Sequence, residues 1–151
     1  MTTPAKPLQQ PPLLLESSFF QHLEVIAEKT PAPDGMQRSY QMGFNAGLAA
    51  NQTDPLQYRV DIGVTGFAAE NAWAPYRFQI NVVGFFRLPE ERTDAQKLLL
   101  LTGAAMLYGS AREMLTLVTG RYIWGPYVLP TVSPIVFLDA AEQQKVIMQK
   151  K

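Results

Sequence analysis

The chain has 151 residues, a formal net charge of zero and no cysteine. This length suits one domain with its own core, and the zero net charge provides no overall field to attract nucleic acid or an acidic membrane. The absence of cysteine excludes disulfides, thiolate catalysis and cysteine-based zinc sites. Only 17% of the residues are charged and 47% are hydrophobic. A small domain with this composition cannot bury all of its apolar surface, which favours oligomerisation or a binding face.

The N-terminal residues 1–12 hold four prolines among polar residues. We expect them to form a disordered arm, followed by a single domain over 13–151. The apolar run 13–15 meets Glu16 at once and is too short for a signal peptide. The longest apolar stretch, 98–107, is only half as long as the roughly 20 residues that a bilayer requires. We therefore expect a cytoplasmic protein with no membrane insertion.

Four segments in the first half of the chain have strand patterns. Residues 13–29 read as a long, irregular first strand. Apolar residues then alternate with a period of two over 40–48, 58–65 and 77–82, the pattern of half-buried strands. Short turn clusters separate the later strands, which favours antiparallel pairing.

The second half of the chain has helical patterns. Thr93 or Asp94 is suited to cap a helix over 95–107. We expect a break at Tyr108-Gly109-Ser110, after which Ser110 and Glu113 have the capping-box spacing of a second helix that stops at Gly120.

A last helix is expected from about Leu138 to Lys150. Strands followed by helices predict an α+β fold, in which a four-stranded antiparallel sheet has the C-terminal helices packed on one face.

No set of residues has the pattern of a catalytic or metal site. His22 is the only histidine and has no partner at metal-ligand spacing. The carboxylates of Glu90 and Glu91 lie in a polar turn, and Arg112 and Glu113 fit structural roles at the start of a helix. We therefore predict a protein that is not an enzyme and has no metal or cofactor.

Aromatic residues are the main functional signal. There are too many of them for the core of one small domain, so some must line an interface or a groove. Glycine and proline keep the segment 122–130 irregular, and its rings are suited to contact apolar segments without sequence preference. The predicted groove residues are Tyr122, Ile123, Trp124, Tyr127 and Leu129.

The segment 103–134 resembles the C-terminal half of SecB, the bacterial protein-export chaperone family. The resemblance is specific there and looser over the rest of 13–137. It depends on four short runs: Ser110-Ala111-Arg112-Glu113, Thr119-Gly120-Arg121, Trp124-Gly125-Pro126 and Leu129-Pro130-Thr131-Val132.

This resemblance implies an α+β homotetramer, a dimer of dimers, that holds unfolded or precursor polypeptides and passes them to the motor SecA. It places the contact between dimers on the fourth strand, at Phe78, Ile80 and Val82. This assignment agrees with the apolar residues on both sides of that strand. The family's motor-binding acids have counterparts in Glu24 and Glu28.

The chain departs from the family in three places. Gln79 stands where a further acid is expected, the chain ends in Lys150-Lys151 instead of an acidic tail, and Gly109-Ser110 replaces a Phe-Pro pair. Chaperoning is therefore better supported than delivery to SecA.

The expected function is that of an ATP-independent holding chaperone with hydrophobic grooves for unfolded or precursor proteins. The alternative is a dedicated adaptor or scaffold for one specific partner, such as an antitoxin or a secretion or phage component.

Overall fold

The computed structural model of the protein describes the backbone of residues 3–5 and 11–149 and the side chains up to Gln144. Most of the expected arm over 1–12 lies outside the described residues, and so do the two lysines at the end of the chain. Both expectations stay predictions.

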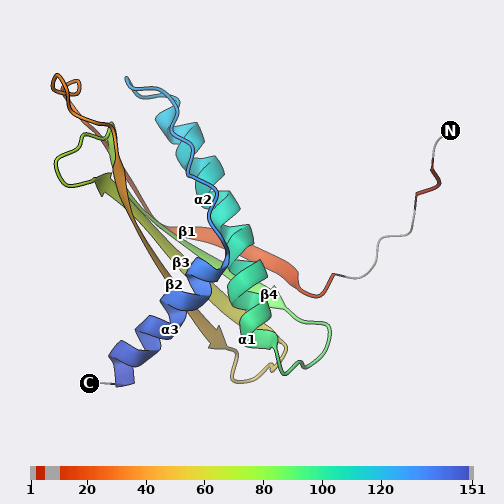
Figure 1. Cartoon of the computed structure of the whole chain (residues 1–151). Coiled ribbons are helices and arrows are strands. Elements are labelled where there is room, and N and C mark those ends of the chain that lie inside the picture. The colour runs from red at the N-terminus through yellow and green to blue at the C-terminus, as the bar shows by residue number, and fades with distance from the viewer. Residues whose placement is uncertain (1–2, 6–10, 150–151) are drawn as a thin grey trace.

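Four strands form one antiparallel sheet in the order β1-β4-β3-β2 (Figure 1). Their bounds are Leu14–Ala27 for β1, Tyr40–Ala50 for β2, Gln57–Ala68 for β3 and Tyr76–Arg87 for β4. The last three strands follow one another across the sheet, whereas β1 pairs with β4. The sheet therefore has β1 and β2 at its two edges.

Alternation along β4 sends its apolar side chains to the face that the helices cover. A Cβ atom added at Gly84 would lie 2.7 Å from the side chain of Leu107, so the residues that share the side of Gly84 point toward the helices. Phe78, Ile80 and Val82 share that side and are at most 2% exposed within the single chain. They have no surface left for a second copy. The sequence-based assignment of a subunit contact to these three side chains is therefore corrected: they belong to the core of the chain itself.

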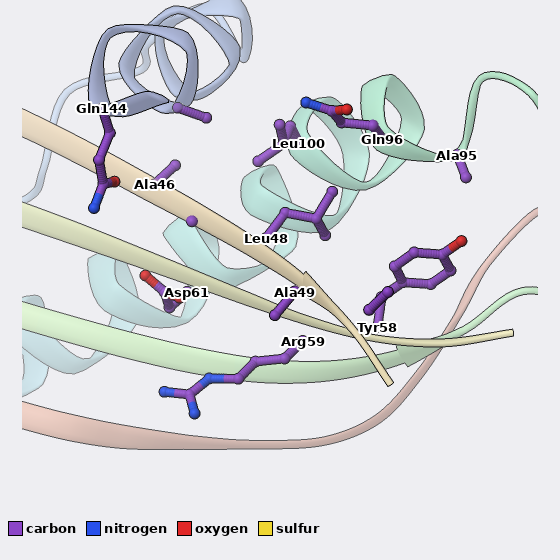
Figure 2. A pocket seen from close by; sticks show the side chains of 13 residues that line it. Ala46, Leu48, Ala49, Tyr58, Arg59, Asp61, Ala95, Gln96, Leu100 and Gln144 are labelled. Atoms are coloured by element: carbon purple, nitrogen blue, oxygen red, sulfur yellow. The ribbon is translucent and has the colours of Figure 1, made fainter. Parts of the chain in front are cut away.

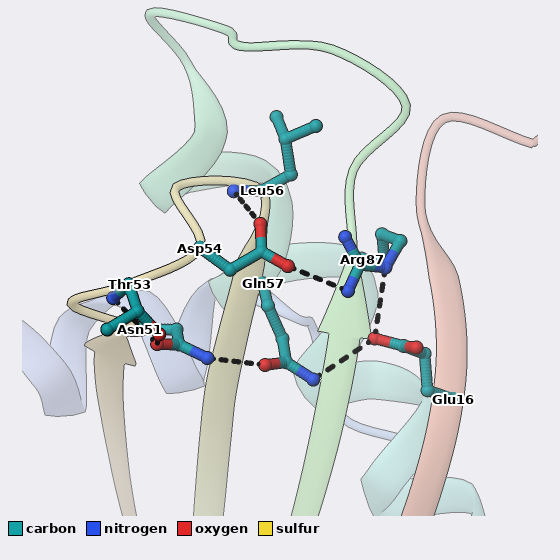
Figure 3. A network of polar contacts seen from close by, with 7 residues as sticks. All are labelled: Glu16, Asn51, Thr53, Asp54, Leu56, Gln57 and Arg87. Carbon is teal, nitrogen blue, oxygen red and sulfur yellow. Dashed lines mark hydrogen bonds and ion pairs between the residues drawn. The ribbon is translucent and has the colours of Figure 1, made fainter.

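The irregular pattern of the first strand has a structural cause. The pairing of β1 with β4 shifts twice, at Glu16 and at Gln21, as in β-bulges. At the first shift, the carboxylate of Glu16 accepts a hydrogen bond from Gln57 and lies 3.4 Å from Nε of Arg87 (Figure 3). Arg87 also donates to Asp54 at 2.8 Å. This network connects β1 to β3 and β4 at one end of the sheet.

The helices α1 (Ala95–Leu98) and α2 (Ala104–Thr119) are joined by the π-helical turn η1 (Leu99–Gly103) into one continuous rod. The break expected at 108–110 is wrong, and so is the capping box, because Ser110 lies inside α2. Tyr108 and Ala111 are buried on either side of it. Their burial outweighs the cost of about 1 kcal/mol for a glycine inside a helix.

The end of α2 at Thr119 confirms the expected stop at Gly120. Thr119 is buried; its hydroxyl donates to the carbonyl of Leu115 and accepts a hydrogen bond from the amide of Tyr127. The last helix, α3 (Ile135–Gln149), begins three residues before the expected start. Pro134 precedes its first residue, a position that suits proline because the missing N–H would have no partner there.

The expected fold class is confirmed, because the helices lie on one face of the four-stranded sheet (Figure 1). The rod α1-η1-α2 covers β3 and β4, and α3 lies across β2. The ring of Phe137 in α3 meets the ring of Phe44 in β2 edge-on, with centroids 5.9 Å apart. The core lies between these two layers.

Candidate functional site

The aromatic segment after α2 divides into anchored and free side chains. Tyr127 lies against Tyr40 and Phe78, with ring centroids 4.5 and 5.8 Å away. Leu129 is fully buried in the core, so its assignment to a binding groove is corrected. The side chain of Ile123, in contrast, is 79% exposed, and that of Tyr122 is 37% exposed.

Trp124 connects this segment to the end of the sheet. Its indole Nε1 donates a hydrogen bond of 2.7 Å to the carbonyl of Glu28, and its ring lies edge-on to Trp73 at 5.4 Å. The hydroxyl of Tyr76 donates to the carbonyl of Gly125, which has a φ of +80° that favours glycine. Trp124 and Tyr127 therefore hold the segment in place, and of the five predicted groove residues only Tyr122 and Ile123 remain available to a partner.

A continuous apolar groove lies between the helical rod and the segment that follows it. It consists of three adjoining hollows of about 540, 200 and 460 Å³. Ala105 and Pro134 line both the first and the middle hollow, and Gly109 and Arg112 line both the middle and the last. We call this feature the helix groove. Its lining is Lys97, Leu101, Thr102, Ala105, Tyr108, Gly109, Arg112, Glu113, Thr116, Leu117, Val128, Thr131, Val132, Ser133, Pro134, Ile135, Phe137 and Leu138.

One wall of the groove is a single face of α2. Ala105, Gly109, Arg112 and Thr116 are three or four residues apart and share one face of α2. Lys97 of α1 and Leu101 and Thr102 of the π turn line the same side. π-helical turns of this kind are frequent at functional sites. This wall was not predicted from the sequence; the signal was the pair of small residues, Ala105 and Gly109, at a spacing of four.

The opposite wall of the groove is the extended segment after α2, and a hydrogen bond from Tyr108 holds it in place. The Tyr108 hydroxyl donates a hydrogen bond of 2.5 Å to the carbonyl of Pro130. Burial raises the pKa of Tyr108 to about 12, so the hydroxyl keeps its proton at neutral pH and remains a donor. The extended segment therefore keeps its place beside α2.

A separate hollow, of about 620 Å³, lies outside the helix groove, at the edge of the sheet between β2 and the helices (Figure 2). Ala46 to Ala50 form one side, and Ala95, Leu100 and Ala141 are among the helical residues on the other. We call it the edge pocket. β2 pairs only with β3 among the described strands, so its outer backbone edge is available to an extended segment.

The two acids expected to contact a motor lie apart from the helix groove and from the edge pocket. Glu24 is paired across the strands with Gln79, on the face that no helix covers, and its carboxylate lies 3.3 Å from His22. Glu28 follows the end of β1. Its side chain is exposed and its backbone is engaged by Pro75 and Trp124.

Within the described part of the chain, no group of three or more His, Cys, Asp or Glu side chains is placed to hold a metal ion. The described helices include none that is both long enough and apolar enough to span a membrane.

In sequence, the chain matches no family model and no curated protein. In structure, it is similar to a SecB-like chaperone of Mycobacterium tuberculosis in complex with a ChAD peptide from an antitoxin. The TM-score is 0.60 and the identity 15%, over 80% of this chain and 88% of that one. It is also similar to a protein of unknown function from Streptococcus agalactiae, with a TM-score of 0.42 and 15% identity over 79% of this chain and 97% of that one. The first similarity shows that the fold is SecB-like, as the sequence resemblance implied.

Proposed function

We propose that this protein is a polypeptide-binding chaperone that holds extended apolar segments in the helix groove. The observation that carries the proposal is the continuity of the groove along the rod, from Lys97 to Leu117. The SecB-like fold supports it, as does the antitoxin peptide bound to the similar chaperone. The more specific form of this proposal is that the protein is an ATP-independent holding chaperone for unfolded or precursor proteins.

The groove has the length and chemistry for a peptide. Between Lys97 and Leu117, a helical rise of 1.5 Å per residue gives about 30 Å, which an extended segment of about nine residues covers. Three charged side chains, Lys97, Arg112 and Glu113, line it among apolar and small residues. Such a surface gains affinity from buried apolar area and selects little by sequence.

Two further contacts extend the proposed site. Tyr122 and Ile123 follow the end of α2 that carries Leu117, where they would contact a segment leaving the groove. At the other side of the molecule, the edge pocket and the free backbone edge of β2 would accept a segment as an added strand.

Aggregation of an unrelated unfolded protein tests this proposal. The purified chain should suppress aggregation without nucleotide. Leu117 and Val128 line the groove and are 64% and 49% exposed, so Leu117→Asp with Val128→Asp should keep the fold. We expect this double variant to lose about tenfold or more in client affinity, because a charge would be buried against an apolar ligand.

Met106→Asp is the matched control. Met106 is an exposed residue of the same helix that does not line the groove, and its variant should bind clients normally. Full suppression by the double variant would contradict the proposed site.

The second candidate function is a dedicated adaptor for one partner, which the antitoxin peptide on the similar chaperone favours. Competition separates the two. A general chaperone should release its client to an excess of any unrelated unfolded protein, whereas a dedicated adaptor should release its partner only to a peptide from that partner.

Delivery to SecA is a finer proposal, and it concerns the open face of the sheet. Glu24 and Glu28 are the acids that would contact the motor, but Gln79 lies beside Glu24 where another acid is expected. The chain also ends in Lys150-Lys151 instead of an acidic tail. Each lost rim charge contributes up to about 1 kcal/mol, so the lost acid and the reversed charge of the tail together should weaken binding to SecA at least tenfold relative to a classical SecB. Calorimetry at low and moderate salt measures it; tight, salt-sensitive binding would restore the delivery role. A cytoplasmic location belongs to the same proposal.

A further inference from the structure

Arg112 is the only charged residue that lines the middle hollow of the helix groove. The rest of that lining is small, aromatic, aliphatic or hydroxylic: Ala105, Tyr108, Gly109, Thr131, Val132, Pro134 and Phe137. The hollow has a volume of about 200 Å³ and shares lining residues with the larger hollow on each side of it. A segment that passes along the groove therefore places a side chain next to Arg112.

The chain itself provides no acid for Arg112. None of the ion pairs within the described part of the chain includes this residue. Its neighbours on the helix surface, three and four positions away, carry no negative charge: they are Tyr108, Gly109, Leu115 and Thr116. Glu113 is adjacent in sequence but lines only the last hollow. A positive charge without a partner among the described residues thus borders the middle of the groove.

The surroundings of Arg112 are suited to donate hydrogen bonds. Thr131 and Val132 line the hollow as part of an extended segment, and their amides have no backbone partner among the described residues. The carbonyl of Pro130 is already engaged by the Tyr108 hydroxyl. Burial raises the pKa of Tyr108, and the positive charge of Arg112 opposes this rise, so the guanidinium lies near that hydroxyl. A ligand with negative charge and acceptor oxygens suits such a site.

We infer that Arg112 is a specificity-determining residue that selects a carboxylate side chain, Asp or Glu, at the middle of the bound segment. This inference rests on the proposed function. A guanidinium group binds a carboxylate through two parallel hydrogen bonds, and such charge-assisted bonds are about twice as strong as neutral ones. A cavity of about 150 Å³ accepts benzene, so a carboxylate side chain fits the middle hollow. Because the groove continues on both sides of the hollow, a side chain within the segment suits it better than the carboxylate of a chain end.

The test uses the full chain and three labelled nine-residue peptides that differ only at the central position: Glu, Gln or Lys. Both ends of each peptide are blocked, so that the central side chain carries the only charge that varies. Affinities are measured by fluorescence anisotropy at low and moderate salt. The unchanged chain should bind the Glu peptide at least about fivefold more tightly than the isosteric Gln peptide, and the Lys peptide most weakly. Added salt should reduce the ratio between the Glu and Gln peptides.

Substitutions of Arg112 should change this preference while keeping the fold, which thermal unfolding checks. Arg112→Gln should abolish the difference between the Glu and Gln peptides, because it removes the charge and keeps a side chain that favours a helix. Arg112→Glu should reverse the order, so that the Lys peptide binds most tightly. The matched control is Arg77→Gln, which removes the same charge from an exposed residue of β4 that does not line the groove. It should leave the ratio unchanged.

Several results would overturn the inference. Equal affinities of the unchanged chain for the Glu and Gln peptides would remove the acid preference. A preference that survives in Arg112→Gln would belong to another cation, and one that is also lost in Arg77→Gln would be a general effect of charge. If a Gln peptide with a free C-terminus binds as tightly as the blocked Glu peptide, and only while Arg112 is present, the site takes chain ends instead. If the unchanged protein binds none of the peptides, the proposed function itself fails, whereas binding without preference leaves that function intact.

Discussion

At the scale of single residues, the aromatic side chains after α2 have two separate roles. Tyr127 and Trp124 connect the segment to the sheet through ring contacts and a hydrogen bond. Tyr122 and Ile123 face solvent. Residue type alone does not separate these roles, because the same ring serves as an anchor or as a contact surface depending on what surrounds it.

Substituting one residue of each kind should separate stability from binding. Tyr127→Ala should lower the free energy of unfolding by about 2–4 kcal/mol, toward the lower end for loss of a large aromatic because Tyr127 is only half-buried. Ile123→Ala should leave stability within about 0.5 kcal/mol, as expected of an exposed position, and weaken client binding. Denaturant unfolding and anisotropy measure the two effects; a stable Tyr127→Ala variant with weak binding would reverse the assignment.

Two tyrosines should make the fold sensitive to alkali. Burial raises the pKa of Tyr40 and of Tyr108 from 10.0 to about 12 each. A raised pKa means that the unfolded chain loses these protons first, so their contribution to stability is complete below pH 10 and is lost between pH 10 and 12. Thermal unfolding across this range should show a falling melting temperature. Tyr108→Phe should show a smaller fall, and an identical slope would contradict this explanation.

At the scale of elements, the continuous rod α1-η1-α2 decides the shape of the groove. The rod keeps one buried side throughout. Leu99, Leu100 and Gly103 are buried within the π turn, and Ala104 and Leu107 are buried after it. These residues are one, three or four positions apart and therefore share one face, so both halves of the rod pack on the sheet.

Ser110→Ala tests whether the rod is continuous. Inside a helix, alanine is more favourable than serine, so stability should rise by about 0.5 kcal/mol. At an N-cap, the same substitution would lower stability by about 1 kcal/mol. The sign of the change in denaturant unfolding distinguishes the two structures, and a loss of stability would restore the helix break at this position.

At the scale of the whole molecule, the sheet has one covered face and one open face. Leu14, Phe19 and Ile26 of β1 pair with β4 residues that point away from the helices, and all three are exposed. The ring of Phe19 reaches that of Phe85 in β4, 6.3 Å away. An edge strand with an exposed apolar row is a common site of association between chains.

We therefore expect the purified chain to be a tetramer, with β1 at one of its contacts. Phe19→Lys should lower the mass measured by sedimentation while keeping the fold, since a lysine on an edge strand opposes pairing. Ile80→Asp should instead unfold the chain, because Ile80 is fully buried in the protomer and an unpaired buried charge costs several kcal/mol. A folded Ile80→Asp dimer would restore the contact to that side of β4, and a stable monomer at micromolar concentration would contradict association altogether.

The sequence by itself determined the local features of this protein: four strands, a helical second half, the stop at Gly120 and the α+β class. These depend on side-chain periodicity and backbone preference, which act between residues close in the chain. Tertiary structure decided what depends on distant partners. It determined that β1 pairs with β4, that Ser110 lies inside a helix, that Ile80 and Leu129 are core residues, and that 97–117 and 128–138 form one groove. The physical reason is magnitude: local preferences are about 1 kcal/mol or less per residue, whereas burying one large apolar side chain contributes about 1.5–3 kcal/mol.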